Sequence, residues 1–221
     1  GIVSGQTLEI LLSMVRTKYL LLLPQPRTIA FSAEAVGRML DGAEASTAGI
    51  VYSDFFDEDT GRGKTLHPLT DYQSGSVRDD FDFGGAVLLS VPVARKSLKT
   101  HGPIPDVRFA GLYDLRLKMS IDHGIHHLAE PLYSVLHDPH GRPDGTGLFA
   151  YVDPRNAQAQ KEMEAVFTDY LRRIGAYLPP EGLAKVDHGP SRPHPVVASV
   201  VIPVLNRKGT ISDAVRSALS Q

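Results

Sequence analysis

The stretch of sequence that decides the fold assignment is Ala198-Ser-Val-Val-Ile-Pro-Val-Leu-Asn-Arg-Lys-Gly-Thr-Ile-Ser-Asp-Ala-Val-Arg-Ser-Ala-Leu-Ser-Gln221. It begins within Val196–Ile202, a run of mostly β-branched apolar residues that is typical of a strand buried on both faces of a parallel sheet. A turn follows over Pro203–Gly209, and Thr210 stands at the position of a helix N-cap. The next apolar residues recur at helical spacing, at Ile211, Ala214, Val215, Ala218 and Leu219. The stretch therefore predicts a strand, a turn and a helix, the opening half of a βαβ unit.

Elements earlier in the chain predict the same fold class. Apolar periodicity predicts helices over Thr7–Arg16 and Phe31–Leu40. The apolar runs Lys18–Leu23 and Ala48–Asp54 are predicted as strands, and Pro24-Gln-Pro26 ends the first of them. Strands and helices that alternate in this way predict an α/β protein with a sheet flanked by helices.

A long amphipathic helix and a proline-rich segment divide the chain. The helix is predicted over Asn156–Leu178, where it either packs on the first domain or bridges two domains. Prolines and glycines in Glu181–Pro195 predict a linker. The expected domains are therefore residues 1–152, a bridging helix and linker at 153–195, and the strand and helix of a second domain at 196–221.

Composition narrows the classes of partner. A net charge of -2 and a pI near 6.5 give no reason to expect nucleic acid or an anionic membrane as partner. The apolar run Tyr19–Leu23 is too short to span a bilayer, so no transmembrane segment is predicted. The chain has no cysteine, hence no disulfide and no thiolate ligand or nucleophile. A reducing, cytoplasmic location fits this composition and is expected.

Ser199–Arg207, together with Ile211 and Ala214–Gln221, resembles the N-terminal signature of the family-two glycosyltransferases. Those enzymes have the GT-A fold, a Rossmann-like sheet flanked by helices, and use a nucleotide-diphosphate sugar as donor. The resemblance implies that Pro203, Leu205 and Asn206 bind the nucleotide, mostly through backbone groups. The alternative is that Pro203 simply ends a strand and Asn206 is a turn residue.

A second resemblance covers about residues 15–137. Val51–Asp54, Arg78–Gly84, Gly111–Leu117 and Glu130–Tyr133 occur in an order that resembles the C-terminal half of a family-two glycosyltransferase domain. The resemblance implies a helix that begins near Gly111 beneath the acceptor site, and then a strand that carries Glu130-Pro-Leu-Tyr133.

This first unit departs from the family at the residues that carry the chemistry. Where the family has an Asp-x-Asp motif that binds a divalent metal, the chain reads Pro24-Gln-Pro26, and proline side chains cannot ligate. Where the family has its catalytic base, the chain reads Gly111-Leu112. Asp114 survives as the one candidate catalytic carboxylate, although in the family this residue more often caps or anchors its helix. The resemblance therefore implies a degenerate GT-A-like unit.

Two further residues are candidates by resemblance. Asp82 is a candidate for an acceptor-side role, and His137 lies near the position where a histidine completes the metal site in some GT-A enzymes. The cluster His123, His126 and His127 is interpreted as surface or supporting residues, because imidazole without the Asp-x-Asp carboxylates is a poor metal site.

The expected function is that of a family-two type glycosyltransferase, which transfers a sugar from a nucleotide-diphosphate sugar to a glycan or lipid-linked acceptor. The intact enzyme would use Mn²⁺ or Mg²⁺, while this chain is expected to be an inactive portion without a metal of its own. The alternatives are a non-catalytic nucleotide- or glycan-binding GT-A-like module and a purely structural partner. We also expect that Val196–Gln221 either folds back onto the first sheet or is exchanged between chains in a homodimer.

Overall fold

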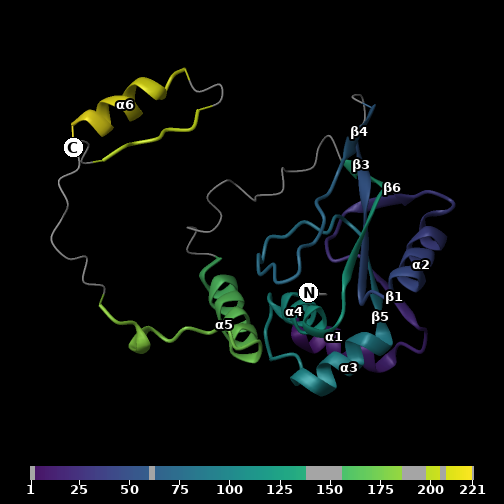
Figure 1. Cartoon of the computed structure of the whole chain (residues 1–221). Coiled ribbons are helices and arrows are strands. Elements are labelled where there is room, and N and C mark those ends of the chain that lie inside the picture. The colour runs from purple at the N-terminus through teal and green to yellow at the C-terminus, as the bar shows by residue number, and fades with distance from the viewer. Residues whose placement is uncertain (1–2, 60–62, 138–155, 186–197, 205–207, 221) are drawn as a thin grey trace. The chain divides into compact units, whose positions relative to one another are not determined.

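A mixed β-sheet forms the centre of the first unit of the chain, Gly1–Leu178. The computed structural model describes residues 3–59, 63–137, 156–185, 198–204 and 208–220. Its strands follow the order β1-β5-β3-β6-β2, and β4 pairs with β3. Their bounds are β1 Tyr19–Leu22, β2 Thr28–Phe31, β3 Ile50–Asp59, β4 Gly63–His67, β5 Val87–Ser90 and β6 Ile125–His137. Figure 1 shows this sheet beside the helices of the first unit.

The pairing directions make the sheet mixed. β3 and β6 run parallel, and every other pair is antiparallel; β5 lies between β1 and β3 and runs opposite to both. The predicted α/β class is confirmed, and the predicted strand β1 is present.

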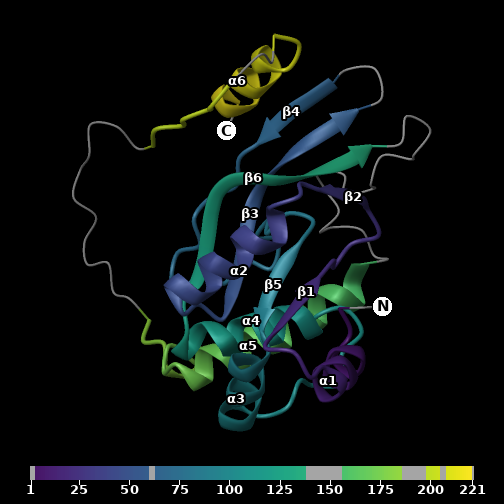
Figure 2. The same ribbon diagram turned by 90° about the vertical axis from the view of Figure 1, so that its right-hand side faces the viewer.

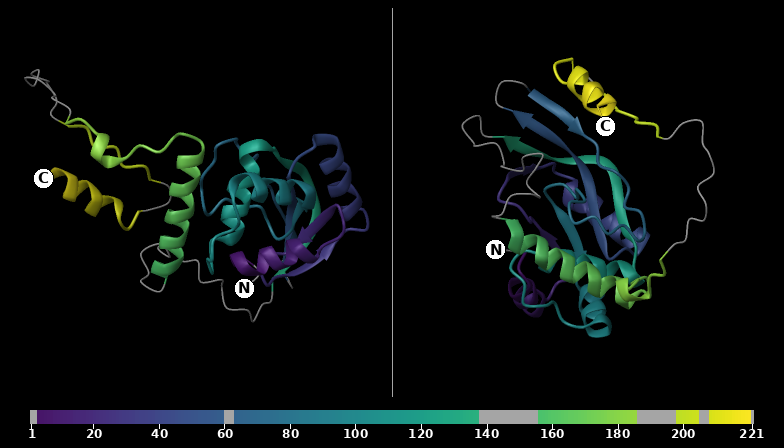
Figure 3. Two further views of the ribbon diagram at one scale, coloured as in Figure 1. Left: turned by 90° about the horizontal axis from the view of Figure 1, so that it is seen from below. Right: turned by 90° about the vertical axis from the view of Figure 1, so that its left-hand side faces the viewer.

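Helices cover both faces of the sheet (Figure 2). Side chains alternate along β3 and β5, so that Val51 and Leu88 pack against α2, Ala35–Ser46, on one face. Ile50 and Leu89 point to the other face and pack against three helices. These are α1 Gly5–Met14, α3 Val91–His101 and α4 Gly111–Asp122. A fifth helix, α5 Ala157–Arg173, packs on α4 through a separate apolar cluster (Figure 3).

Two segments differ from the predictions because of strand pairing. The helix expected from Phe31 begins only at Ala35, since Phe31 ends β2, which pairs with the remote β6, and its ring packs 5.7 Å from that of Tyr133. The strand expected over Ala48–Asp54 continues to Asp59, because it forms a hairpin with the neighbouring β4.

Strand β6 carries the predicted Glu130-Pro-Leu-Tyr133 motif. Its parallel register against β3 shifts between Ser53, which faces Leu128, and Phe55, which faces Tyr133. Pro131 lies within this irregular stretch, as expected for a residue that has no N–H to give to a ladder. Asp54 is the β3 residue at the irregularity, and its side chain is buried.

The second unit, Pro179–Gln221, contains the short 3-10 helix η3, Pro180–Gly182, and the helix α6, Ile211–Leu219, which begins after Thr210 as predicted. The described residues 198–204 form no strand, and Val200 and Val201 are exposed. The predicted strand is therefore absent from these described residues. Its return onto the first sheet and its exchange between chains stay predictions.

The helices of the described ranges include none that is both long and apolar enough to cross a membrane.

Candidate functional site

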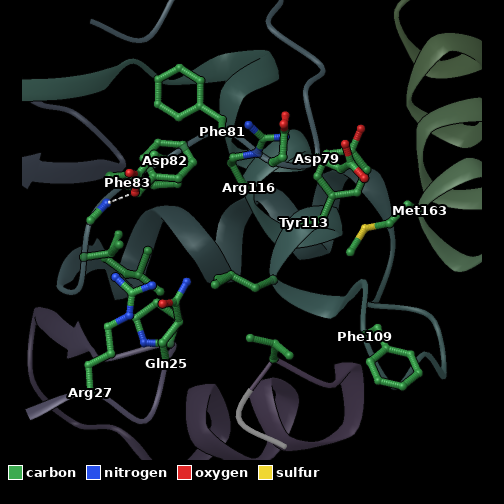
Figure 4. A pocket seen from close by; sticks show the side chains of 18 residues that line it. Gln25, Arg27, Asp79, Phe81, Asp82, Phe83, Phe109, Tyr113, Arg116 and Met163 are labelled. Atoms are coloured by element: carbon green, nitrogen blue, oxygen red, sulfur yellow. Dashed lines mark hydrogen bonds between the residues drawn. The ribbon is translucent and has the colours of Figure 1, made fainter. Parts of the chain in front are cut away.

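A pocket of about 530 Å³ opens on one side of the first unit (Figure 4). Its lining includes Val3 before α1, the segment after β1 with Pro24, Gln25 and Arg27, the loop before β5, Phe109 with the first turns of α4, and Met163 of α5. Its floor is apolar and comes from β3 and β5. The volume lies within the range of small-molecule sites in proteins.

The loop between β4 and β5 forms one wall, and residues 68–84 are named the pocket loop here. Phe81 and Phe83 anchor it, because their ring centroids lie 6.1 and 5.0 Å from that of Tyr52 on β3. Asp82 lines the pocket; its Oδ1 accepts a hydrogen bond of 2.8 Å from the Gly84 N–H, and most of its side chain is exposed. The candidate acceptor-side carboxylate is thus held at the pocket surface.

Helix α4 fastens the other end of the pocket loop. Tyr113 Oη donates to the Val77 carbonyl at 2.5 Å, and Arg116 Nη2 donates to the Arg78 carbonyl at 2.8 Å. Asp80 is paired with Arg78 at the surface, with 3.0 Å from Arg78 Nε to Asp80 Oδ1. The loop that carries three pocket carboxylates is therefore fixed to α4 mainly through its backbone.

Arg116 is a buried cation at the edge of the pocket, with 4% of its surface exposed. The centre of its guanidinium lies 4.9 Å from the ring of Tyr113, 5.6 Å from Phe83 and 5.8 Å from Tyr72. Its Nη1 is buried and has no hydrogen-bond partner among the described residues. Burial lowers the pKa of Arg116, while these aromatic faces provide a favourable environment for the cation.

Asp114 lies in a buried ion pair rather than on the pocket lining. Its Oδ2 is 2.7 Å from Lys118 Nζ, one helical turn on, and both side chains are 4% exposed. Lys118 Nζ also donates to the Pro103 carbonyl at 2.7 Å. Burial raises the pKa of Asp114, and the hydrogen bond from Lys118 offsets part of that rise. These contacts fit an anchor of α4.

Glu162 of α5 caps the start of α4. Its Oε2 accepts N–H groups from Phe109 at 2.7 Å and Ala110 at 3.3 Å, the residues just before the helix. Ala110 is the N-cap residue and has no side-chain oxygen of its own, so a carboxylate from a neighbouring helix replaces the usual cap. This contact and the apolar cluster of α4 and α5 show that α5 packs on the first domain. A bridge from α5 to a second domain stays a prediction.

The resemblance assigns the metal site to the position of Pro24-Gln-Pro26, and Pro24 and Gln25 line the pocket. Across the described ranges, no group of three or more histidine, aspartate or glutamate side chains is arranged to hold a metal ion. The backbone of His137 ends β6, and its side chain lies outside the described residues.

The candidate nucleotide residues belong to the second unit. Pro203 is exposed there, and Leu205 and Asn206 lie outside the described residues. Their assigned roles stay predictions.

Sequence reasoning missed two residues near the pocket. Arg116 was part of the quoted family motif, but nothing in the local pattern indicated that its charge is buried. His127 was grouped with surface or supporting histidines, whereas it is buried between Asp54 and Asp71. No spacing signal marks this contact, because the three residues lie far apart in the sequence.

Comparison with known proteins gives no family assignment: no protein-family model matches the chain, and no curated protein shows a significant match.

Proposed function

We propose that the chain is a portion of a family-two type glycosyltransferase, and that its first unit is a GT-A-like domain that binds a sugar-containing ligand without transferring it. One observation carries this proposal. Pro24 and Gln25, Leu112, and Asp82 occupy the positions that the resemblance assigns to metal, base and acceptor, and all of them line one pocket.

The lining suits a sugar. The rings of Phe81, Phe83 and Phe109 offer apolar faces on which a pyranose can stack. Asp79 and Asp82 add carboxylate oxygens, which accept hydrogen bonds from hydroxyl groups. A cavity of about 530 Å³ holds more than one sugar ring.

The residues do not suit proton transfer at the family's position. Gly111 and Leu112 carry no titratable side chain. Burial raises the pKa of the adjacent Tyr113 to about 12, so its phenol stays protonated near neutral pH and is a poor general base. Asp114 is already engaged by Lys118.

The metal of the family does not fit these residues. Mn²⁺ and Mg²⁺ prefer several oxygen ligands, and carboxylates above all. The positions of the Asp-x-Asp motif offer two prolines and the single amide oxygen of Gln25. We therefore derive no step of a reaction through a metal in this unit.

A second candidate function is that of a non-catalytic nucleotide- or glycan-binding module that is not part of a transferase. The mixture of aromatic rings and carboxylates in the pocket favours this reading equally, since glycan binding requires neither metal nor base. The intact glycosyltransferase and the module differ in what they predict for nucleotides.

Isothermal titration of the full chain separates these candidates. The ligands are uridine and guanosine diphosphate, each with and without Mn²⁺, and cellotetraose, maltotetraose and mannotetraose as neutral glycans. Metal-independent binding of a nucleotide supports the proposal, and metal-independent binding of a glycan without any nucleotide favours the module. Nucleotide binding that requires Mn²⁺ would contradict our interpretation of Pro24-Gln-Pro26. Binding of neither leaves only a structural role and contradicts the proposal.

Two controls locate the binding and test catalysis. Phe109→Ala should weaken ligand binding, because Phe109 lines the pocket. Tyr177→Ala, which replaces an aromatic residue outside the pocket lining, should leave ligand binding unchanged. The chain should also release no nucleotide from nucleotide sugars. Sugar transfer that metal chelation abolishes would contradict our interpretation of Pro24-Gln-Pro26.

A further inference from the structure

His127 bridges two carboxylates on the side of the pocket loop that faces the sheet. Its Nε2 lies 2.8 Å from Asp54 Oδ1, and its Nδ1 lies 2.7 Å from Asp71 Oδ1. The imidazole is 5% exposed and the Asp54 side chain 9%, whereas the Asp71 side chain is 89% exposed. A buried ring thus links a carboxylate of β3 with a carboxylate of the loop.

A neutral imidazole cannot make both contacts as hydrogen bonds. It has one N–H donor and one nitrogen lone pair, and an ionised carboxylate only accepts. The lone pair would then face a carboxylate oxygen at hydrogen-bond distance. Both contacts are favourable only when His127 carries two protons, so the geometry selects the imidazolium form.

The groups that face the ring all hold the start of the pocket loop. Besides the two carboxylates, the titratable neighbour is Tyr52, whose ring stacks on the imidazole at 4.8 Å and 16°. The Tyr52 hydroxyl donates to the Thr70 carbonyl at 2.6 Å, and Asp54 Oδ1 accepts the Leu69 N–H at 2.7 Å. Three successive loop residues, 69–71, therefore depend on this cluster.

The cluster reaches the pocket through Tyr52. One side of the tyrosine contacts His127, while its edge packs against Phe81 and Phe83, which line the pocket. A change in the position of residues 69–71 therefore alters the support of the pocket wall.

We propose that His127 is a positioning residue, and that its doubly protonated ring clamps the pocket loop onto β3 and β6. Loss of one proton releases Asp71 and loosens residues 68–84. Deprotonation of the ring therefore lowers the order of the pocket wall. The effect of pH on ligand binding follows from this clamp together with the proposed function; the clamp itself does not depend on the ligand.

Hydrogen exchange of the full chain tests the clamp without a ligand. Protection factors, which correct for the intrinsic pH dependence of exchange, are measured for amides 69–84 at about pH 5.5 and about pH 8. We expect a drop of about threefold to tenfold, the effect of one charge-assisted hydrogen bond to an exposed partner. Unchanged protection would overturn the proposal.

Asp71→Asn is the decisive variant, because Asp71 is exposed and its replacement should not prevent folding. An asparagine amide both donates and accepts, so it can pair with either form of the ring. The variant should keep the loop protected at both pH values. A pH-dependent drop equal to that of the wild type would sink the idea.

His101→Gln provides the matched control. His101 contacts a single carboxylate, with Nε2 2.7 Å from Asp122 Oδ2, and lies on α3. Its replacement should leave the pH response of residues 69–84 intact, and loss of that response would contradict the assignment to His127. If no nucleotide or glycan binds at either pH, the proposed function fails, while the exchange result still decides the clamp.

Discussion

Replacing Lys118 by methionine tests whether Asp114 is a structural anchor. The variant leaves a carboxylate that is 4% exposed without its partner at 2.7 Å. Removal of one member of a buried ion pair costs about 3–5 kcal/mol of unfolding free energy. Loss of the hydrogen bond from Lys118 to the Pro103 carbonyl adds about 1 kcal/mol.

The double variant Asp114→Leu/Lys118→Met separates pairing from burial. With both charges replaced by apolar groups of similar size, stability should return to within about 1–2 kcal/mol of the wild type. Arg173→Met is the matched control, because Arg173 pairs with Asp169 over the same i,i+4 spacing, 2.6 Å apart, but at the surface. Arg173→Met should lower the unfolding free energy by less than about 1 kcal/mol.

Urea unfolding followed by circular dichroism measures all three variants. The effect of Lys118→Met should also depend on pH. Burial raises the pKa of Asp114 in the folded state, so the folded state holds this proton more tightly than the unfolded state. The stability gained from this tighter proton binding is fully present below the pKa of Asp114 in the unfolded state, about 3.9, and is lost as the pH rises through its pKa in the folded state. The penalty should therefore shrink on acidification. A Lys118→Met variant no less stable than Arg173→Met at neutral pH would refute the buried-pair reasoning.

Three further predictions concern the cap, a glycine and a tyrosine. Glu162→Ala removes the carboxylate that caps α4 and should lower the unfolding free energy by about 1 kcal/mol in the same assay. Glu164→Ala, at an exposed position of the same helix, should change the unfolding free energy little, and equal effects of the two variants would argue against the cap. Gly84→Ala should lower the unfolding free energy more than Gly75→Ala does. Both glycines have a positive φ, 73° and 85°, which costs a residue with a Cβ about 1–2 kcal/mol of strain, but only at Gly84 would the new Cβ collide with Tyr133 Oη. Equal losses would show that the hydroxyl moves aside. Burial raises the pKa of Tyr133 to about 12. The contribution of this group to the unfolding free energy is therefore fully present below about pH 10 and is lost between about pH 10 and about pH 12. A phenolate absorbance titration in which Tyr133 ionises near pH 10 would be inconsistent with its burial.

Local pattern sufficed for the elements that have their own periodicity. The apolar run that became β1 forms where its own pattern predicted a strand. The helix that begins at Gly111 and the strand with Glu130-Pro-Leu-Tyr133 were implied by the resemblance instead, and both form. The lack of carboxylates in Pro24-Gln-Pro26 was also readable from the sequence, because it depends on side-chain chemistry alone.

Pairing between strands was not readable in this way. β2 and the hairpin of β3 and β4 were missed, and β5 proved to run antiparallel between β1 and β3. Strand direction and register depend on partners that are remote along the chain, whereas periodicity reports only which face of a segment is apolar. Val200 and Val201 show the converse: a run with strong β character forms no strand without a neighbour.

The sequence by itself determined the α/β class, and it showed that Pro24-Gln-Pro26 holds no carboxylate and Gly111-Leu112 no titratable side chain. Only the tertiary structure decided that these positions meet in one pocket, that Asp114 is engaged by Lys118, and that His127 lies between two carboxylates. The physical reason is that side-chain chemistry and hydrophobic periodicity are properties of neighbouring residues, while the burial and pairing of a charge are set by groups that folding brings from elsewhere in the chain.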